Sequence, residues 1–274
     1  MSETCTHNCE TCGASCPSNT AGQDLRAPLH PQSNITQVIG VVSGKGGVGK
    51  SMVSSLIACE LNRKGLRVGI LDADITGPSI PRMFGRTDKA TGDSSGILPV
   101  VSDTGIKMMS VNFLLEDEAQ PVIWRGPVIS GVVKQFWSEV IWGEIDVLVV
   151  DLPPGTGDVA LTVFQSMPID GLVIVTTPQA LVSMVVEKAV NMAAEMDIPV
   201  LGLVENMAYV RCPDCGDEIA LFGPSHTAQV ALSHNLPILA RLPLDANIAG
   251  LADSGKTEEI QSEEIAQAVQ RIMA

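Results

Sequence analysis

The sequence predicts an α/β domain with a mainly parallel, doubly wound sheet covered by helices on both faces, preceded by a short Cys-rich N-terminal tail. Apolar, β-branched runs without polar alternation, such as residues 38–42 and 145–150, indicate strands buried on both faces. Helical patterns separate these runs, which is the order expected for parallel strands joined by crossover helices. Ligands of such sheets bind outside the carboxyl ends of the strands, where most polar motifs of this chain occur.

Composition narrows the functional class. The 274 residues suit one large domain with a tail, and 45% of them are hydrophobic, which is enough for a sizeable core. A formal net charge of −14 opposes binding to nucleic acid or to anionic lipid. No apolar run reaches the roughly 18 residues of a membrane span, and the first residues lack the features of a signal peptide. We therefore expect a cytoplasmic protein that binds neither nucleic acid nor a membrane.

Residues 1–33 form the predicted flexible tail and linker, rich in Cys, Ser, Thr, Asn and Pro and without apolar periodicity. Seven cysteines in a cytosolic protein indicate metal or redox chemistry ahead of structural disulfides. Four of them follow the spacing C-x3-C-x2-C-x3-C and could hold a 4Fe-4S cluster or a zinc ion, or remain unligated thiols. These tail cysteines are Cys5, Cys9, Cys12 and Cys16.

Residues 34–274 form the predicted folded domain, in which strands and helices alternate. The strand over 38–42 precedes a helix over 52–64, in which Cys59 is expected to pack in the core. Gly65 ends that helix before a second buried strand. The remaining predicted elements are strands over 66–71, 96–101, 106–111, 145–150, 172–176, 200–204 and 238–241, and helices over 128–140, 179–196, 226–234 and 258–273.

Residues 44–51 fit the pattern G-x-x-x-x-G-K-[ST] of a phosphate-binding loop between a strand and a helix. Glycines let the backbone wrap an anion, and successive N–H groups and the following helix dipole then face the phosphates. Lys50 would reach the β- and γ-phosphates, and the Ser51 hydroxyl would hold Mg²⁺. The pattern predicts a nucleoside triphosphate site formed by Gly44, Lys45, Gly46, Gly47, Val48, Gly49, Lys50 and Ser51.

Carboxylates at the ends of two strands extend this predicted site. Asp151 ends an apolar strand, as a Walker B carboxylate does, and would bind Mg²⁺ through water. Asp72 and Asp74 leave another strand, and both would repel a triphosphate unless one faces Mg²⁺ and the other orients water. We assign the water to Asp74. The alternative for Asp72 or Asp74 is a helix cap or turn former.

Lys45 lies outside the ordinary loop pattern, because a second lysine there has no phosphate to meet in its own subunit. The loop resembles that of the deviant Walker A ATPases, the MinD/ParA class, which reads K-G-G-x-G-K-[ST]. The resemblance implies that Lys45 reaches the nucleotide of a partner subunit across a face-to-face dimer, and that Asp74 is catalytic. It also implies ATP as the nucleotide, with Asn206 contacting adenine and with Pro243 and Asp245 on the other side of the base.

Cys212 and Cys215, in the segment C-P-D-C-G, have the form of a metal knuckle that presents two thiolates to one soft ion or cluster. The pair supplies only two of the four ligands that such a site requires. Two copies meeting in a symmetric dimer would supply all four. A zinc site completed by other residues and a redox disulfide remain as alternatives.

As a set, the motifs resemble the Mrp/ApbC branch of that ATPase class over residues 34–274. They are the phosphate loop, D-A-D-I-T-G-P-S, W-R-G-P, D-L-P-P-G-T-G-D, E-N-M and C-x-x-C, with Leu152 in place of the usual threonine. The resemblance implies a homodimeric, ATP-hydrolysing carrier that bridges a 4Fe-4S cluster between two C-x-x-C pairs and delivers it to apo iron–sulfur proteins. The alternatives are a MinD/ParA-like positioning ATPase and a redox ATPase similar to the nitrogenase iron protein.

Overall fold

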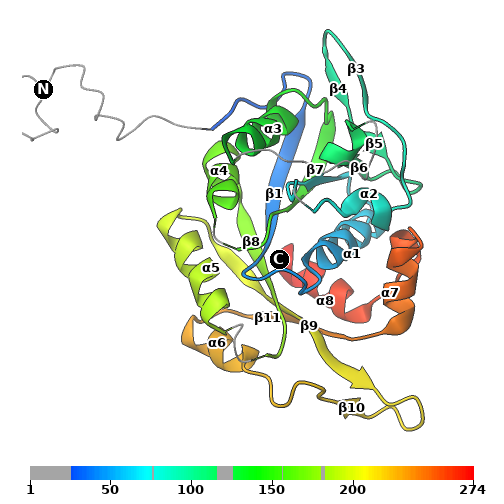
Figure 1. Ribbon diagram of the computed structural model, residues 1–274, viewed down its shortest axis with the longest axis vertical. Coiled ribbons are helices and arrows are strands. Elements are labelled where there is room, and N and C mark those ends of the chain that lie inside the picture. Colours follow the sequence, from blue (N-terminus) through cyan, green and yellow to red (C-terminus); the bar gives the residue numbers. More distant parts are fainter. Residues whose placement is uncertain (1–25, 76, 116–125, 156, 180–182) are drawn as a thin grey trace, which may run out of the picture.

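The computed structural model describes residues 26–75, 77–115, 126–155, 157–179 and 183–274 (Figure 1). Residues 1–25 of the predicted tail therefore lie outside the described residues, and with them Cys5, Cys9, Cys12 and Cys16. The described residues 26–33 contact the domain: the Ala27 N–H donates to the Ser166 carbonyl. The predicted helix over 179–196 also begins among residues that are not described.

A nine-stranded sheet, ordered β10-β9-β8-β1-β7-β2-β6-β5 with β11 paired to β9, forms the centre of the domain. Only β5 and β10 run antiparallel to their neighbours in this sheet. The predicted parallel α/β fold is confirmed. The strands are β1 (Asn34–Ser43), β2 (Val68–Asp72), β5 (Val100–Val101), β6 (Lys107–Met109), β7 (Glu144–Asp151), β8 (Gly171–Thr176), β9 (Val200–Arg211), β10 (Glu218–Ile219) and β11 (Ile238–Pro243), with β3 (Thr91–Asp93) and β4 (Gly96–Leu98) in a separate hairpin.

Helices cover both faces of the sheet and bury a separate apolar cluster on each (Figure 1). Strands β2 and β8 are buried along their whole length, as expected for strands enclosed from both sides. One face carries α3 (Gly126–Ser138), α4 (Asp158–Ser166), α5 (Ser183–Glu195) and α6 (Thr227–Ser233), and the other carries α1 (Lys50–Arg63), α2 (Ile80–Met83), α7 (Ala246–Asp253) and α8 (Glu263–Ile272), besides the 3₁₀ turns at Val111–Phe113 and Thr257–Glu259.

The structure corrects the predicted C-terminal helix over 258–273. The helix α8 begins only at Glu263, because the Ser262 side chain accepts a hydrogen bond from the Ile265 backbone N–H and caps it. The amide of Asn247 donates to Asp245 at the start of α7, a helix that the sequence analysis did not predict. Helix α4 was likewise not predicted. Every helix among the described residues is too short or too polar to cross a bilayer.

Strand β9 is longer than predicted. It continues from Val200 to Arg211, whereas the apolar pattern predicted an end at Val204. The extension contains polar residues whose partners come from other elements: Glu205 pairs with Arg241 of β11, and Asn206 donates to the Val48 carbonyl. The extra length carries the strand from the phosphate loop to the cysteine knuckle.

Replacement of Trp142 tests the packing of the core. The Trp142 side chain is fully buried, and its indole N–H donates to the Phe136 carbonyl at 3.1 Å. We expect Trp142→Ala to lower the free energy of unfolding by about 3–5 kcal/mol, measured by denaturant titration without nucleotide. Leu232→Ala is the control, because Leu232 is 83% exposed, and its cost should stay within about 0.5 kcal/mol. Equal costs for both variants would contradict the described core.

Candidate functional site

The glycine loop lies between the carboxyl end of β1 and the start of α1, and its backbone requires glycine at particular positions. Gly47 and Gly49 both have a φ of 80°, in the left-handed region that other L-residues adopt with strain. A Cβ atom on Gly44 would lie 1.8 Å from Cγ1 of Val185 in α5. The loop therefore combines special backbone angles with close packing against α5.

A cavity of about 240 Å³ opens beside this loop. Its wall includes Gly46, Gly49, Lys50 and Ser51 from the loop and the first turn of α1, and Asp74 from the segment after β2. The structure thus brings together the predicted phosphate-loop residues and Asp74. Backbone N–H groups at the start of a helix make such a cavity suitable for an anion.

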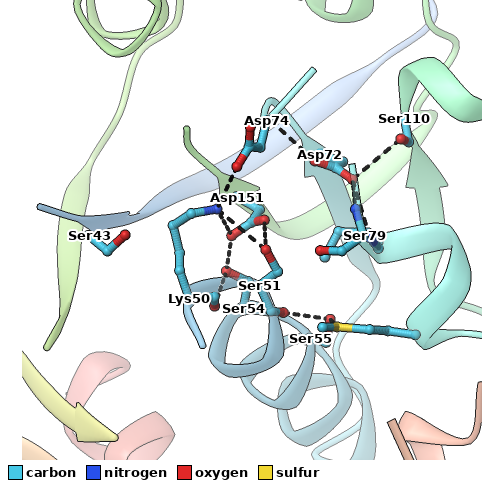
Figure 2. Close-up of polar contacts among 12 residues, drawn as sticks. Ser43, Lys50, Ser51, Ser54, Ser55, Asp72, Asp74, Ser79, Ser110 and Asp151 are labelled. Carbon is cyan, nitrogen blue, oxygen red and sulfur yellow. Dashed lines mark hydrogen bonds and ion pairs between the residues drawn. The ribbon is translucent and has the colours of Figure 1, made fainter. Parts of the chain in front are cut away.

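The carboxylate of Asp151, at the end of β7, contacts three side chains of α1 beside the cavity (Figure 2). It is fully buried, and its Oδ1 lies 2.9 Å from the Lys50 ammonium. The Ser51 hydroxyl donates to its Oδ2 at 2.6 Å, and the Ser54 hydroxyl lies 2.7 Å from Oδ1. A hydroxyl and a carboxylate in this arrangement are a suitable donor set for Mg²⁺.

Ser54 is a site residue that the sequence analysis missed. It is fully buried and contacts Asp151, four residues along α1 from Lys50. That spacing places both residues on the same face of the helix, and it is the signal that could have identified Ser54.

The carboxylates of Asp72 and Asp74 have different surroundings. The buried carboxylate of Asp72 accepts hydrogen bonds from the backbone N–H groups of Ser79 and Ile80, at the start of α2, and from the Ser110 hydroxyl (Figure 2). Asp72 is therefore a helix cap, the alternative that the sequence left open. Burial, and then the neighbouring Asp151 carboxylate, raise the pKa of Asp72 to about 8. Asp74 instead lines the cavity, with its carboxylate 3.8 Å from the Lys50 ammonium.

Of the residues predicted to contact the adenine base, Asn206 lies against the phosphate loop. The Asn206 amide group donates to the Val48 carbonyl at 2.9 Å, and its Oδ1 is buried without a hydrogen-bond partner among the described residues. A buried acceptor in this condition is suited to a ligand donor. Pro243, at the end of β11, and Asp245, which caps α7, are not part of the cavity wall, and neither is Asn206.

Lys45 is not part of the cavity wall. The residue is exposed, and its ammonium has no ion pair within the described parts of the chain. Its carbonyl accepts from the Ser43 hydroxyl at 3.0 Å, which holds the backbone while the side chain stays accessible.

The cysteine knuckle forms the turn between β9 and β10. The Cys212 N–H donates to the Asp217 carbonyl, and the Gly216 N–H donates to the Cys212 carbonyl, both at 2.9 Å. Backbone N–H groups of Cys215 and Asp214 face the Cys212 sulfur and lower its pKa, which favours the thiolate that binds metals. No group of three metal-ligating side chains occurs among the described residues.

Cys59 behaves as predicted. It is buried in α1, where burial raises the pKa of its thiol to about 12, so it packs in the core and is not a ligand.

A glycine loop between a parallel strand and a helix, with Lys50 and Ser51 against the Asp151 carboxylate, defines a P-loop NTPase. The family model described as NUBPL iron-transfer P-loop NTPase, of the ParA group, matches residues 34–274. The chain belongs to this family, and the family predicted from the sequence motifs is confirmed.

Individual relatives agree with this assignment. The chain is 48% identical over 238 residues to a Clostridium perfringens protein named iron-sulfur cluster carrier protein, covering 84% of each chain. It is 44% identical to an Archaeoglobus fulgidus nucleotide-binding protein solved with ADP, with a TM-score of 0.76 and coverage of 84% of this chain and 90% of that one. The Pyrococcus horikoshii septum site-determining protein MinD shares the fold, at 19% identity and a TM-score of 0.60, covering 86% and 94% of the two chains.

Two glycine substitutions test the packing of the loop. We expect Gly44→Ala to lower the free energy of unfolding by about 1–3 kcal/mol without nucleotide, because the new methyl group overlaps Val185. Gly46→Ala is the matched control, since its Cβ would meet nothing nearer than 4.0 Å and its φ is not positive. Its cost should stay within about 0.5 kcal/mol. Denaturant titration measures both values, and a Gly44→Ala variant as stable as the control would contradict the described packing.

Proposed function

We propose that this protein is a cytoplasmic, homodimeric ATPase that carries a 4Fe-4S cluster between two copies of its cysteine knuckle and delivers it to apo iron–sulfur proteins. The observation that carries the proposal is the half-site at Cys212 and Cys215, which has two thiols and no third metal-ligating side chain beside them in the described chain. A symmetric dimer turns one such pair into four thiolates. The name of the Clostridium relative supports an iron–sulfur cargo.

The residues of the cavity fit a magnesium nucleotide. The left-handed glycines and the α1 terminus would cradle the phosphates, and Lys50 would leave Asp151 to neutralise them. Ser51 and Asp151 would hold Mg²⁺, which supplies charge neutralisation when bound. The unpartnered Oδ1 of Asn206 would accept from the adenine amino group, which favours ATP.

Hydrolysis would follow from the side chains that surround the γ-phosphate. We assign to Asp74 the orientation of a water molecule, whose oxygen attacks the γ-phosphorus while the bond to the β–γ bridging oxygen breaks. ADP keeps the bridging oxygen, and the water proton leaves with phosphate. The exposed Lys45 of one copy would stabilise the charge on the nucleotide of the other. Hydrolysis would therefore report whether the dimer is closed.

Cluster delivery is a ligand exchange that requires no electron transfer. Four client thiols lose their protons as their sulfurs bind iron, and the four carrier thiolates take up protons as they leave. The lowered pKa of Cys212 suits this role, because it stabilises the thiolate without the desolvation that makes Cys59 inert. The tail cysteines stay a separate prediction, as a second cluster or a zinc site.

Metal content tests the proposal. After anaerobic purification and reconstitution of the full chain, we expect about two irons per chain from a cluster shared by two copies, and about six if the tail holds a second cluster. Cys212→Ala/Cys215→Ala should remove about two irons per chain and abolish transfer to an apo-ferredoxin. Iron, sulfide and zinc are counted on each sample.

The matched control replaces Cys5, Cys9, Cys12 and Cys16 with alanine and should keep the two shared irons per chain. Cluster transfer at the wild-type rate by the Cys212→Ala/Cys215→Ala variant would overturn the proposal. Zinc without iron in the wild-type chain would do the same.

A further inference from the structure

One strand carries both candidate sites. Asn206 of β9 contacts the phosphate loop, and Cys212 follows the last residue of the same strand. In Figure 1, β9 leaves the central sheet and runs outward to the β10 hairpin. Any change in the backbone between these residues alters how one site is placed relative to the other.

That backbone contains a bulge. Glu205 lies opposite Arg241 and Tyr209 lies opposite Pro243, so β9 advances four residues where β11 advances two. Met207 lies inside the bulge with a φ of 54°. Among the described residues, the other non-glycine positions with positive φ are Asp197 and Asn235. Asp and Asn adopt this conformation readily, whereas methionine does so only where its surroundings impose it.

The strand before the bulge is attached to the phosphate loop. The Asn206 amide donates to the Val48 carbonyl, and its Nδ2 would lie 2.2 Å from a Cβ on Gly49. The Asn206 amide therefore packs directly against the backbone of the loop at Gly49. In the proposed function, the unpartnered Oδ1 of the same side chain would give a bound nucleotide a direct contact with this attachment.

The strand after the bulge carries the knuckle and is held by contacts other than those of Asn206. The Leu244 N–H donates to the Tyr209 carbonyl at 2.8 Å, and Arg211 pairs with Glu264 of α8. Arg211 and Val210 pair with Glu218 and Ile219 of β10, which closes the hairpin around the cysteines. The guanidinium groups of Arg211 and Arg241 lie over the Tyr209 ring, with their Cζ atoms 5.8 and 5.7 Å from the ring centroid. The bulge is the joint between the loop attachment and this hairpin.

We infer that Met207 is the positioning residue through which nucleotide occupancy of the phosphate loop sets the orientation, and so the thiol reactivity, of the Cys212/Cys215 knuckle. This inference rests on the proposed function for the identity of the nucleotide. Because the backbone angles of Met207 are restricted, a movement of Asn206 would also move the hairpin. A residue free to adopt many backbone angles would let the two ends move independently.

The test measures alkylation of Cys212 and Cys215 by iodoacetamide in the full-length, metal-free chain, resolved by peptide mass spectrometry. In the wild type, magnesium and a non-hydrolysable ATP analogue should change the rate by about fivefold or more. Met207→Gly should bind the analogue with similar affinity but lose this dependence. Met207→Asn should retain it, because asparagine tolerates the left-handed conformation.

The controls are Asp197→Gly and Asn235→Gly, which remove a positive-φ side chain elsewhere and should respond as the wild type does. A wild-type response in Met207→Gly, no response in the wild type, or loss of response in the controls would overturn the inference. If Met207→Gly does not fold, loss of the response in folded Met207→Asn overturns it and retention supports it. Iron content, measured separately, distinguishes the carrier function from the role of Met207. If the chain holds no iron but its alkylation rate depends on the nucleotide, only the carrier function is refuted. If the iron content is normal but the alkylation rate does not depend on the nucleotide, only the role of Met207 is refuted.

Discussion

The buried carboxylate of Asp151 is the constraint on which the rest of the site depends. A fully buried charge is stable only with close partners, and removal of one partner of such a pair typically costs about 3–5 kcal/mol. Here the partners Lys50, Ser51 and Ser54 all come from the first turns of α1, so the ion pair sets where that helix and the preceding glycine loop lie against β7. Strand register also places Asp72 directly beside Asp151, whose charge adds to the effect of burial in raising the pKa of Asp72.

Two features of the chain are incomplete within one subunit. Lys45 extends from the loop with no ion pair in the described chain, and the knuckle presents two thiols where a cluster needs four ligands. A single symmetric dimer would supply a partner for each. We therefore propose that the nucleotide site and the cluster site are both completed by the same dimer. In each copy, strand β9 links the two sites covalently.

Much of this could be predicted from the sequence, because the informative patterns are local. The spacing of glycines, Lys50 and Ser51 identified the loop, and uninterrupted apolar runs identified the central strands. What the sequence could not provide depends on distant partners. Glu205 and Asn206 look unsuited to a strand until Arg241 and Val48 are in place. The role of Asp72 depends on which backbone N–H groups it meets, and the bulge at Met207 depends on the register with β11.

The central claim is that each nucleotide site is completed by Lys45 of a second copy. The most direct measurement is ATP hydrolysis by a mixture of Lys45→Ala and Lys50→Ala chains, each of which we expect to be inactive alone. A mixed dimer has one intact site, formed by Lys50 of the first chain and Lys45 of the second. Equal mixing should therefore restore about a quarter of the wild-type rate, because half of the dimers are mixed and each has one working site. No recovery on mixing, or wild-type hydrolysis by Lys45→Ala alone, would contradict the account.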